Sequence, residues 1–230
     1  MQTAVLIHGC HLGAKHWANI AWGDPQNGIL GRAPKGIQLA LEGDCKFLIW
    51  GTGASERDGM KESEFTLTYA AAHHKELACL ASEGAEEADA LLRSMSYLDT
   101  ESQNTEEEIL NAVSVCIARN VWRLKLVSSP VHISRCYLDA LKLREAGKIP
   151  KEFKFAQDES DTNFADSKVS DVVIIEPPHR GDMPAFQTHR YAKAMFGVMR
   201  QGNARFAEFL RDLGELLKKY GVHVDWKPVK

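Results

Sequence analysis

Short apolar runs recur along the chain, and each one stops at a turn that contains Gly, Ser or Pro. Apolar runs bounded by such turn residues are typical of strands that are buried on both faces of a sheet. The pattern predicts six short strands, at Ala4–Ile7, Lys46–Trp50, Tyr97–Leu98, Leu126–Val127, Phe153–Ala156 and Asp171–Glu176.

Helical periodicity fills the intervals between these runs. Helices are predicted over Gly36–Leu41, from Glu62 towards Leu80, around Leu91 to Met95, over Ile109–Ile117, and from Pro130 to Gly147. Just before Ile109, Thr105 and Glu108 have the spacing of a capping box. Strands that alternate with helices favour a Rossmann-like, doubly wound α/β fold, with a mainly parallel sheet and helices on both faces. We therefore predict one α/β domain over residues 1–230, with a helical insertion at about 65–95 and a C-terminal helical extension at about 190–220. The amphipathic helix of that extension is expected to pack on the sheet or on a second subunit, so a homodimer is one expectation.

Polar turns follow five of the predicted strands. In a parallel sheet the carboxyl ends of the strands share one edge, and ligands bind in the crevice beyond it. The topology would therefore bring five turns together, namely Gly9–His11, Gly51–Gly53, Ser102–Thr105, Ser128–His132 and Pro177–Arg180.

The turn at Ser128 reads as a strand that passes directly into a helix. Ser129 can cap the helix and Pro130 suits its first position, so free N–H groups and the positive end of the helix dipole would favour an anionic ligand. His132 and Arg135 are three residues apart and share one helix face. Taken alone, the same pattern also fits an ordinary strand-to-helix connection.

The loop after the first strand is long and rich in histidine, and long loops in compact domains are often functional. His8, His11 and His16 allow a metal hypothesis, although no HExxH motif and no cysteine pair supports it. Cys10 beside His11 could be an activated nucleophile, but neighbouring residues usually point apart. His179, in the stiff Pro-Pro turn, is a further imidazole beside the predicted crevice.

Composition excludes some classes of protein. A formal charge of −3 and a pI near 6.3 argue against a protein that coats nucleic acid or an anionic membrane. The five cysteines form no CxxC pair, which favours reduced thiols, and the N-terminus lacks the features of a signal peptide. We therefore expect a soluble, cytoplasmic protein that acts on a small molecule.

Four ordered motifs resemble those of the family that includes YdcF, SanA and ElyC. The motifs are Gly51-Thr52-Gly53, Ser63-Glu64, Ser102-Gln103-Asn104-Thr105-Glu106-Glu107, and the stretch from Leu126 to Arg135. The resemblance covers about Val5 to Tyr137. The chain departs from the family pattern at several positions: Glu108 replaces Asn, Phe65 and Cys136 replace Ala, and Trp50-Gly51-Thr52-Gly53 differs from Ser-Gly-Gly.

The resemblance implies a ligand-binding cleft lined by the matching residues. Members with a membrane anchor are linked to cell-wall precursor metabolism, whereas YdcF looks like a soluble S-adenosylmethionine binder. Together with the turns above, it gives candidate ligand-binding residues Gly9, His11, Gly51, Thr52, Gly53, Ser63, Ser102, Asn104, Thr105, Ser128, Ser129, Arg135 and His179.

Three functions stay open from the sequence. The first is a cleft protein that binds a nucleotide-like or anionic small molecule such as S-adenosylmethionine, as a transferase or hydrolase with His132 as acid/base and Glu64 or Glu107 orienting it. The second is a non-catalytic ligand-sensing or interaction protein. The third is a metal-dependent phosphate-ester hydrolase.

Overall fold

The structure is a computed structural model that describes residues 2–43, 45–164, 215 and 219. The chain divides into two compact units, residues 1–172 and 173–230. The predicted strand at Asp171–Glu176, the predicted extension at 190–220 and His179 lie outside the described residues, apart from positions 215 and 219 of that extension. Apart from positions 215 and 219, the described residues all belong to the first unit.

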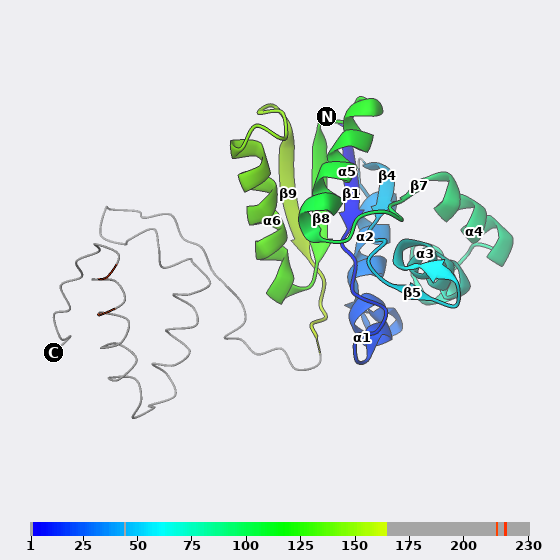
Figure 1. The fold of residues 1–230 in the computed structure, drawn as a ribbon. Coiled ribbons are helices and arrows are strands. Elements are labelled where there is room, and N and C mark those ends of the chain that lie inside the picture. Colours follow the sequence, from blue (N-terminus) through cyan, green and yellow to red (C-terminus); the bar gives the residue numbers. More distant parts are fainter. Residues whose placement is uncertain (1, 44, 165–214, 216–218, 220–230) are drawn as a thin grey trace, which may run out of the picture. The chain divides into compact units, whose positions relative to one another are not determined.

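The first unit is built on a five-stranded parallel sheet with the order β7-β4-β1-β8-β9 (Figure 1). Its strands are β1 (Thr3–Ile7), β4 (Cys45–Trp50), β7 (Ser96–Leu98), β8 (Arg123–Ser128) and β9 (Lys154–Glu159). From β1 the chain first adds β4 and β7 on one side and then β8 and β9 on the other, so the direction of winding reverses between β1 and β8. This confirms the predicted α/β fold class, and it places a switch point, where such sheets bind ligands, between these two strands.

The register makes the carboxyl ends of the inner strands level. Ile7 of β1 lies opposite Trp50 of β4 and Val127 of β8, and Trp50 in turn lies opposite Leu98 of β7. The turns that follow these strands therefore leave the sheet at the same height. This is the geometry that the predicted convergence of the turns requires.

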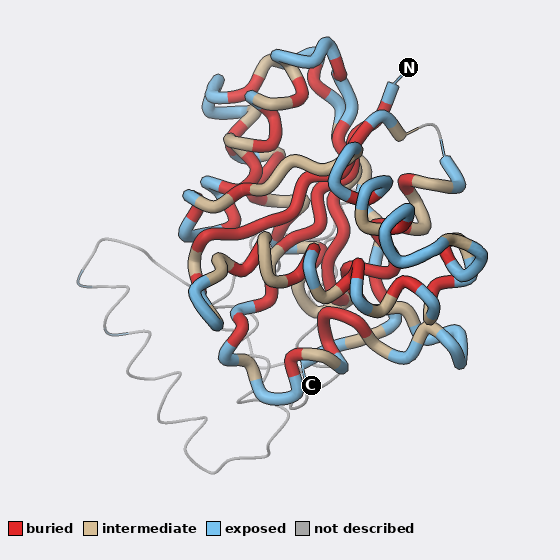
Figure 2. The backbone as a smooth tube through the Cα atoms, turned by 90° about the vertical axis from the view of Figure 1, so that its right-hand side faces the viewer, coloured by how far each residue is buried: buried red, intermediate tan, exposed pale blue. Residues whose placement is uncertain are grey.

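Side chains alternate between the two faces of the sheet, and each face has its own core. Ala4 and Leu6 of β1 pack under α5 (Thr105–Ala118) and α6 (Pro130–Glu145). Val5 and Ile7 face the opposite core, which contains α2 (Arg32–Leu41), α3 (Glu62–Ala72) and α4 (Ala85–Ser94). The inner strands β1, β4 and β8 are therefore buried on both sides, as Figure 2 shows by their colour, whereas the edge strands β7 and β9 are partly exposed.

Short elements complete the unit. They are α1 (Trp17–Ala21), β2 (Gly23–Asp24), η1 (Pro25–Asn27), β3 (Ile29–Leu30), β5 (Glu56–Arg57), β6 (Met60–Lys61) and η2 (His74–Glu76). The long loop after β1 packs Cys10, Leu12 and Trp17 into a third small core, with Phe65 and Tyr69 against it. Within the described residues, no helix has the length and apolar character needed to cross a membrane.

The predicted helical insertion at about 65–95 is the connection between β4 and β7. It consists of α3, η2 and α4, and its buried leucines belong to the core beneath α2 (Figure 1). The segment is therefore the crossover connection between two parallel strands of the sheet as well as a pair of helices.

Candidate functional site

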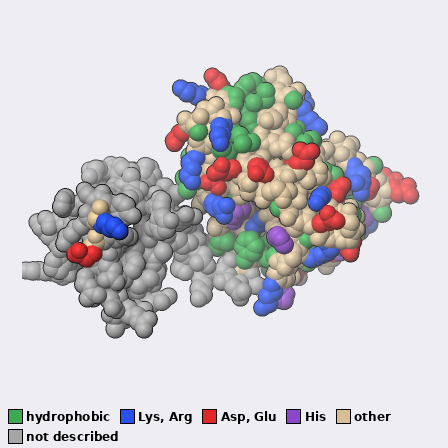
Figure 3. Space-filling model, viewed as in Figure 1, with side chains coloured by type: hydrophobic (Ala, Val, Ile, Leu, Met, Phe, Trp, Pro, Cys, Tyr) green, Lys and Arg blue, Asp and Glu red, His purple; other side chains and the backbone are tan. Residues whose placement is uncertain are grey.

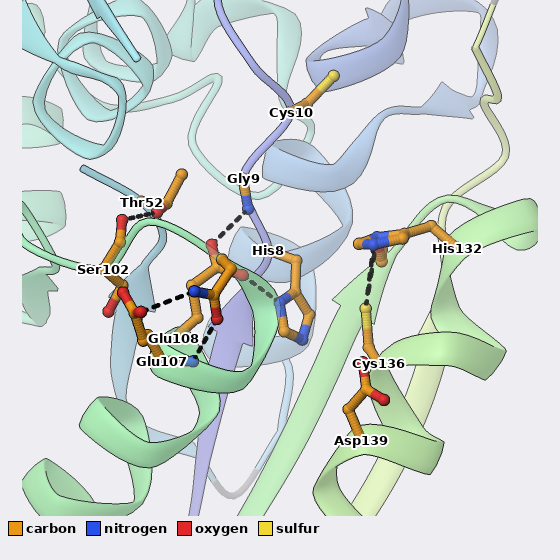
Figure 4. A network of polar contacts seen from close by, with 12 residues as sticks. His8, Gly9, Cys10, Thr52, Ser102, Glu107, Glu108, His132, Cys136 and Asp139 are labelled. Atoms are coloured by element: carbon orange, nitrogen blue, oxygen red, sulfur yellow. Dashed lines mark hydrogen bonds and ion pairs between the residues drawn. The ribbon is translucent and has the colours of Figure 1, made fainter. Parts of the chain in front are cut away.

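Two buried carboxylates hold the turn that follows β1. His8 Nδ1 lies 2.7 Å from Glu108 Oε2, and the Gly9 amide donates to Glu108 Oε1 at 3.1 Å (Figure 4). The Cys10 amide donates to Glu62 Oε1, and the hydroxyl of Ser55 donates to Glu62 Oε2 at 2.6 Å. The backbone amides of Gly9 and Cys10 are therefore occupied by the protein's own carboxylates.

Gly9 and Gly51 make room for these carboxylates. A Cβ atom at Gly51 would overlap Glu108 Oε1, and one at Gly9 would lie 2.6 Å from Glu62 Oε1. Since ordinary carbon–oxygen contacts are longer, an alanine at either position would push a glutamate away. The two glycines thus lie in the predicted crevice, but close packing of side chains explains them.

Arg32, the first residue of α2, is buried beside the same turn with an exposed fraction of 1%. Its Nε donates to the Ser129 hydroxyl at 2.9 Å, and its Nη1 donates to the carbonyl oxygens of His8 and Gly9. Its Nη2 is buried and has no hydrogen-bond partner among the described residues. No carboxylate in the described part of the chain forms an ion pair with this guanidinium, although a buried charge is costly without one.

His8 has an unusual acid–base character. Burial alone would lower its pKa, but interactions with Cys136 and Glu108 outweigh burial and raise the pKa to about 10. The imidazole is therefore cationic at neutral pH, held by Glu108 at Nδ1. Its Nε2 is buried and makes no hydrogen bond of normal geometry with the residues described.

His132 lies on the other side of His8, and the two rings meet edge to face with centroids 6.2 Å apart (Figure 4). Its Nδ1 is 2.9 Å from Ser128 Oγ and 3.3 Å from Cys136 Sγ. Burial, together with the charges of Arg32, His8 and Arg135, lowers the pKa of His132 to about 2. His132 is thus a neutral imidazole, whereas a general acid at neutral pH needs a protonated one.

The N-terminus of α6 is already satisfied. The Val131 amide donates to Asn163 Oδ1 at 3.1 Å, and the His132 amide donates to the Ser129 carbonyl at 2.8 Å. Pro130 has no N–H to offer, and the Ser129 hydroxyl, which we predicted as a cap, makes no capping hydrogen bond. Ser128 and Ser129 lie in the site as predicted, but they contribute through their side chains, on His132 and Arg32.

The turns after β4 and β7 bind each other. The Thr52 hydroxyl and the Gly53 amide both donate to the carbonyl of Ser102, the latter at 3.0 Å. Asp99 Oδ1 accepts from the Ser102 amide at 3.0 Å. Thr52, Gly53 and Ser102 therefore converge as predicted, and their hydrogen bonds close the turns on themselves.

Several motif residues serve as helix caps. Glu64 accepts from the Lys61 amide at 2.8 Å in a capping box, and Glu107 accepts from the Gln103 amide at 2.8 Å and from the Asn104 side chain at 2.7 Å. Asn104 is the N-cap of α5 and accepts from the Glu107 amide at 3.0 Å. The predicted capping box of Thr105 with Glu108 is wrong, because Asn104 is the cap and Glu108 points inward to His8.

The two remaining motif positions near these caps are buried. Thr105 is the first residue of α5. Ser63 lies in the first turn of α3, and its hydroxyl has no partner within the described residues.

Other candidates lie outside the cluster. The Arg135 side chain is 67% exposed and lies 3.6 Å from Asp139, one turn further along α6. His11 is exposed and accepts from the Gly13 amide at 3.1 Å, and His16 is exposed at the start of α1. The three histidines of the first loop are thus held in different surroundings, and no group of three or more His, Cys, Asp or Glu residues in the described ranges could hold a metal ion.

Sequence reasoning missed Glu62, Arg32 and Cys136, treated Glu108 only as a cap and gave His8 no role beyond a metal ligand. A signal existed for the glutamates. Glu108 shares the buried face of α5 with Ala112 and Cys116, and Glu62 shares the buried face of α3 with Thr66 and Ala70, each at a spacing of four. Helical phase therefore selects Glu108 over Glu107 and Glu62 over Glu64. No local pattern identifies Arg32, because its partners His8, Gly9 and Ser129 are distant in sequence.

The site is closed. A cavity of about 10 Å³ lies between the β1 turn, Arg32 and Glu62, which is room for about one water molecule. A larger hollow of about 600 Å³ lies at the opposite, amino edge of the sheet, where Lys35, Lys125 and Arg123 line it. There Asp158 pairs with both lysines, at 3.2 and 3.5 Å, so their charge is offset. We place the functional site at the carboxyl edge, where buried groups have shifted pKa values and unmet hydrogen bonds.

No protein-family model matches this sequence, and comparisons with curated proteins and with solved structures give no significant match. The resemblance to the family of YdcF, SanA and ElyC therefore stays a prediction that rests on the four motifs alone.

Proposed function

We propose that the chain binds a small anionic molecule at the carboxyl edge of the sheet between β1 and β8. The observation that carries the proposal is the buried guanidinium of Arg32, which is held by neutral oxygens and keeps Nη2 without a partner among the described residues. Buried polar groups in folded proteins are almost always paired, so an unpaired buried donor at a switch point points to a ligand.

The charges of the cluster support an anion. Arg32 and His8 are both cationic at neutral pH, and the carboxylate of Glu108 is bound to His8. The second carboxyl group, Glu62, has its pKa raised by burial, against the effect of hydrogen bonds from Ser55 and Cys10. The positive charge of Arg32 is therefore the least compensated in the cluster, and a carboxylate or phosphate oxygen is its natural partner.

The same geometry favours His8 over His132 as the group that moves a proton. Its Nδ1 is fixed by Glu108, which leaves Nε2 as the protonated, unpaired nitrogen. A transferase or hydrolase acting on a nucleotide-like substrate could use such an acid. The carboxylate of S-adenosylmethionine, or a phosphate of a nucleotide, would bind Arg32. The sulfonium group of S-adenosylmethionine, or the base of the nucleotide, would lie away from the cationic side chains of Arg32 and His8.

Thermal shift measurements test the proposal. Inorganic pyrophosphate, ATP, S-adenosylmethionine and a divalent metal salt are each added to the wild type, to Arg32→Lys and to Arg119→Lys. Arg119 is a matched control, because its guanidinium lies over the ring of Phe47 as that of Arg32 lies over the ring of Phe164, but Arg119 is exposed at the C-terminus of α5. At about 100 times the Kd, a ligand adds about 2.7 kcal/mol of stability, which is a shift of several degrees.

We expect at least one anion to stabilise the wild type and Arg119→Lys, and Arg32→Lys to lose most of that shift because lysine lacks the planar fork of donors. An equal anion shift in all three proteins would refute the assignment of Arg32. Stabilisation by the metal alone would favour a metal-dependent hydrolase. Stabilisation by none of the four additives would favour a non-catalytic interaction protein.

A further inference from the structure

The chain leaves β9 and crosses the carboxyl edge of the sheet as an extended segment, Ser160–Phe164, here called the strap. The Ser160 amide donates to the Ser128 carbonyl at 3.0 Å, directly at the end of β8. At its far end, the Phe164 ring covers the guanidinium of Arg32, with Cζ 5.3 Å from the ring centroid. Among the described residues, Phe164 of the strap is therefore the aromatic side chain that covers the Arg32 guanidinium.

Hydrogen bonds hold the strap in place. The Thr162 hydroxyl donates to the Ile20 carbonyl at 2.7 Å, and Asn163 accepts from the Val131 amide at 3.1 Å. Asp161 exchanges two hydrogen bonds with Leu30, both at 2.8 Å. Asp161, Asn163 and Phe164 are exposed, and no strap residue belongs to a hydrophobic core cluster. Segments with few buried apolar contacts and exposed hydrogen bonds open at low free-energy cost.

The space around Arg32 shows why opening matters. The cavity beside Arg32 lies against the β1 turn and Glu62, is lined by no strap residue, and has room for about one water molecule. A phosphate, a carboxylate or a nucleotide is larger, so it reaches Nη2 only if a covering element moves. The strap is the covering element with the fewest apolar contacts, whereas the β1 turn and α2 are anchored in the cores.

We infer that the strap is a lid over the anion site, with Phe164 as its gate. The inference rests on the proposed function for its purpose, but the opening itself does not require a ligand. The lid swings Phe164 away from Arg32, exposes the guanidinium, and closes again when the Thr162 and Asn163 hydrogen bonds re-form.

Chemical modification of arginine by phenylglyoxal tests the lid in the full chain without any ligand. The rate at Arg32 is measured by peptide mass spectrometry and divided by the rate at Arg93, whose side chain is 50% exposed. The variants are Phe164→Ala, Thr162→Val and the control Leu91→Ala, which removes an apolar side chain of nearly equal exposure, 39% against 38% for Phe164, from α4.

In the wild type we expect Arg32 to react far more slowly than Arg93. Loss of one hydrogen bond in Thr162→Val should raise the relative rate by about two- to tenfold, and Phe164→Ala should raise it at least as much, while Leu91→Ala leaves it unchanged. Hydrogen exchange of β1 is measured in parallel, because only a local opening leaves the β1 amides protected.

The lid is refuted if Arg32 in the wild type reacts as fast as Arg93, or if neither strap variant changes its rate. An increase that comes with loss of protection in β1 reflects global unfolding and also counts against it. The lid and the anion site are separable: accessible Arg32 in the strap variants without any anion-induced thermal shift would keep the lid and reject the proposed ligand class.

Discussion

The described turns at the carboxyl edge form two pairs, and the two pairs satisfy their buried polar groups in different ways. The turns after β4 and β7 close on each other through neutral donors and the Ser102 carbonyl. The turns after β1 and β8 hold His8, Glu108 and Arg32, which are charged, buried and in part unpaired. Figure 4 shows the neutral contact of Thr52 with Ser102 next to the charged contact of His8 with Glu108. Asp99 in the turn after β7 is also buried and keeps one carboxylate oxygen, Oδ2, without a partner among the described residues. The comparison teaches that convergence alone does not make a site: the unpaired atoms of the β1 and β8 turns are cationic donors, His8 Nε2 and Arg32 Nη2, whereas that of the other pair is an acceptor.

The largest effect is expected at Glu108. Glu108→Ala leaves the cationic His8 buried without its carboxylate and frees the Gly9 amide. Breaking a buried ion pair on one side typically costs about 3–5 kcal/mol. Urea denaturation at pH 7 measures the loss. Glu106→Ala is the matched control, because Glu106 lies in the same helical turn but is exposed.

If Glu108→Ala lowers the free energy of unfolding no more than Glu106→Ala does, the charged contacts of the β1 and β8 turns add no special stability. The contrast between the two pairs of turns would then fail. The near-isosteric Glu108→Gln should lie between these variants, because it keeps the shape and one hydrogen bond but loses the charge.

The pH dependence of stability separates the two histidines. The folded-state pKa of His8, about 10, lies above its ordinary value of 6.5, so the folded state binds the proton more tightly. Its contribution is complete below pH 6.5 and is lost as the pH rises towards 10, with an order of magnitude of up to about 3 kcal/mol between pH 7 and 9.5. For His132 the pKa is lowered to about 2, so its contribution is present above pH 6.5 and is lost as the pH falls.

Urea denaturation from pH 4 to 9.5 should therefore show highest stability near pH 6–7. Glu108→Gln should flatten the alkaline side, and His132→Asn should flatten the acid side. If the wild-type curve is level between pH 7 and 9.5, His8 is not a buried cation and the electrostatic account of the site fails.

The smallest effect is expected at the neutral contact between the turns after β4 and β7. Thr52→Val removes one donor to the Ser102 carbonyl, which still accepts from the Gly53 amide. Loss of one such hydrogen bond costs about 0.5–1.5 kcal/mol. The change should be the same at pH 7 and pH 9.5, because no ionisable side chain takes part in this contact; a strongly pH-dependent cost would show that the two pairs of turns are coupled.

The sequence predicted the sheet well because apolar runs report burial directly. All five strands of the described sheet were expected, with boundaries that differ by up to a few residues, as for Leu126–Val127, which extends to Arg123–Ser128. The convergence of four of the five turns also followed, because it depends only on parallel topology; the fifth, Pro177–Arg180, lies outside the described residues. Exposed surface carries mixed charges on the side seen in Figure 3, in keeping with the low net charge.

The chemistry of the site was predicted less well. The resemblance led to Glu64 and Glu107, whose carboxylates cap helices, while Glu62 and Glu108 face inward. Helical phase could have corrected this, since Glu62 and Glu108 each lie four residues before a buried position of their helix, whereas Glu64 and Glu107 do not. The role of Arg32 could not be inferred locally, because three distant segments supply its acceptors. The shifted pKa values of His8 and His132 depend on burial and on neighbouring side chains from other elements, which only the assembled fold provides.

The most direct test of the anion site is a ¹H–¹⁵N NMR titration with inorganic pyrophosphate, observing the side-chain Nε–H of Arg32 and the ring nitrogens of His8. We predict that both signals shift together and saturate at one concentration, and that Arg32→Lys abolishes the saturable shift at His8. Signals of Arg32 and His8 that stay fixed, while those of exposed lysines and arginines drift without saturation, would contradict the account.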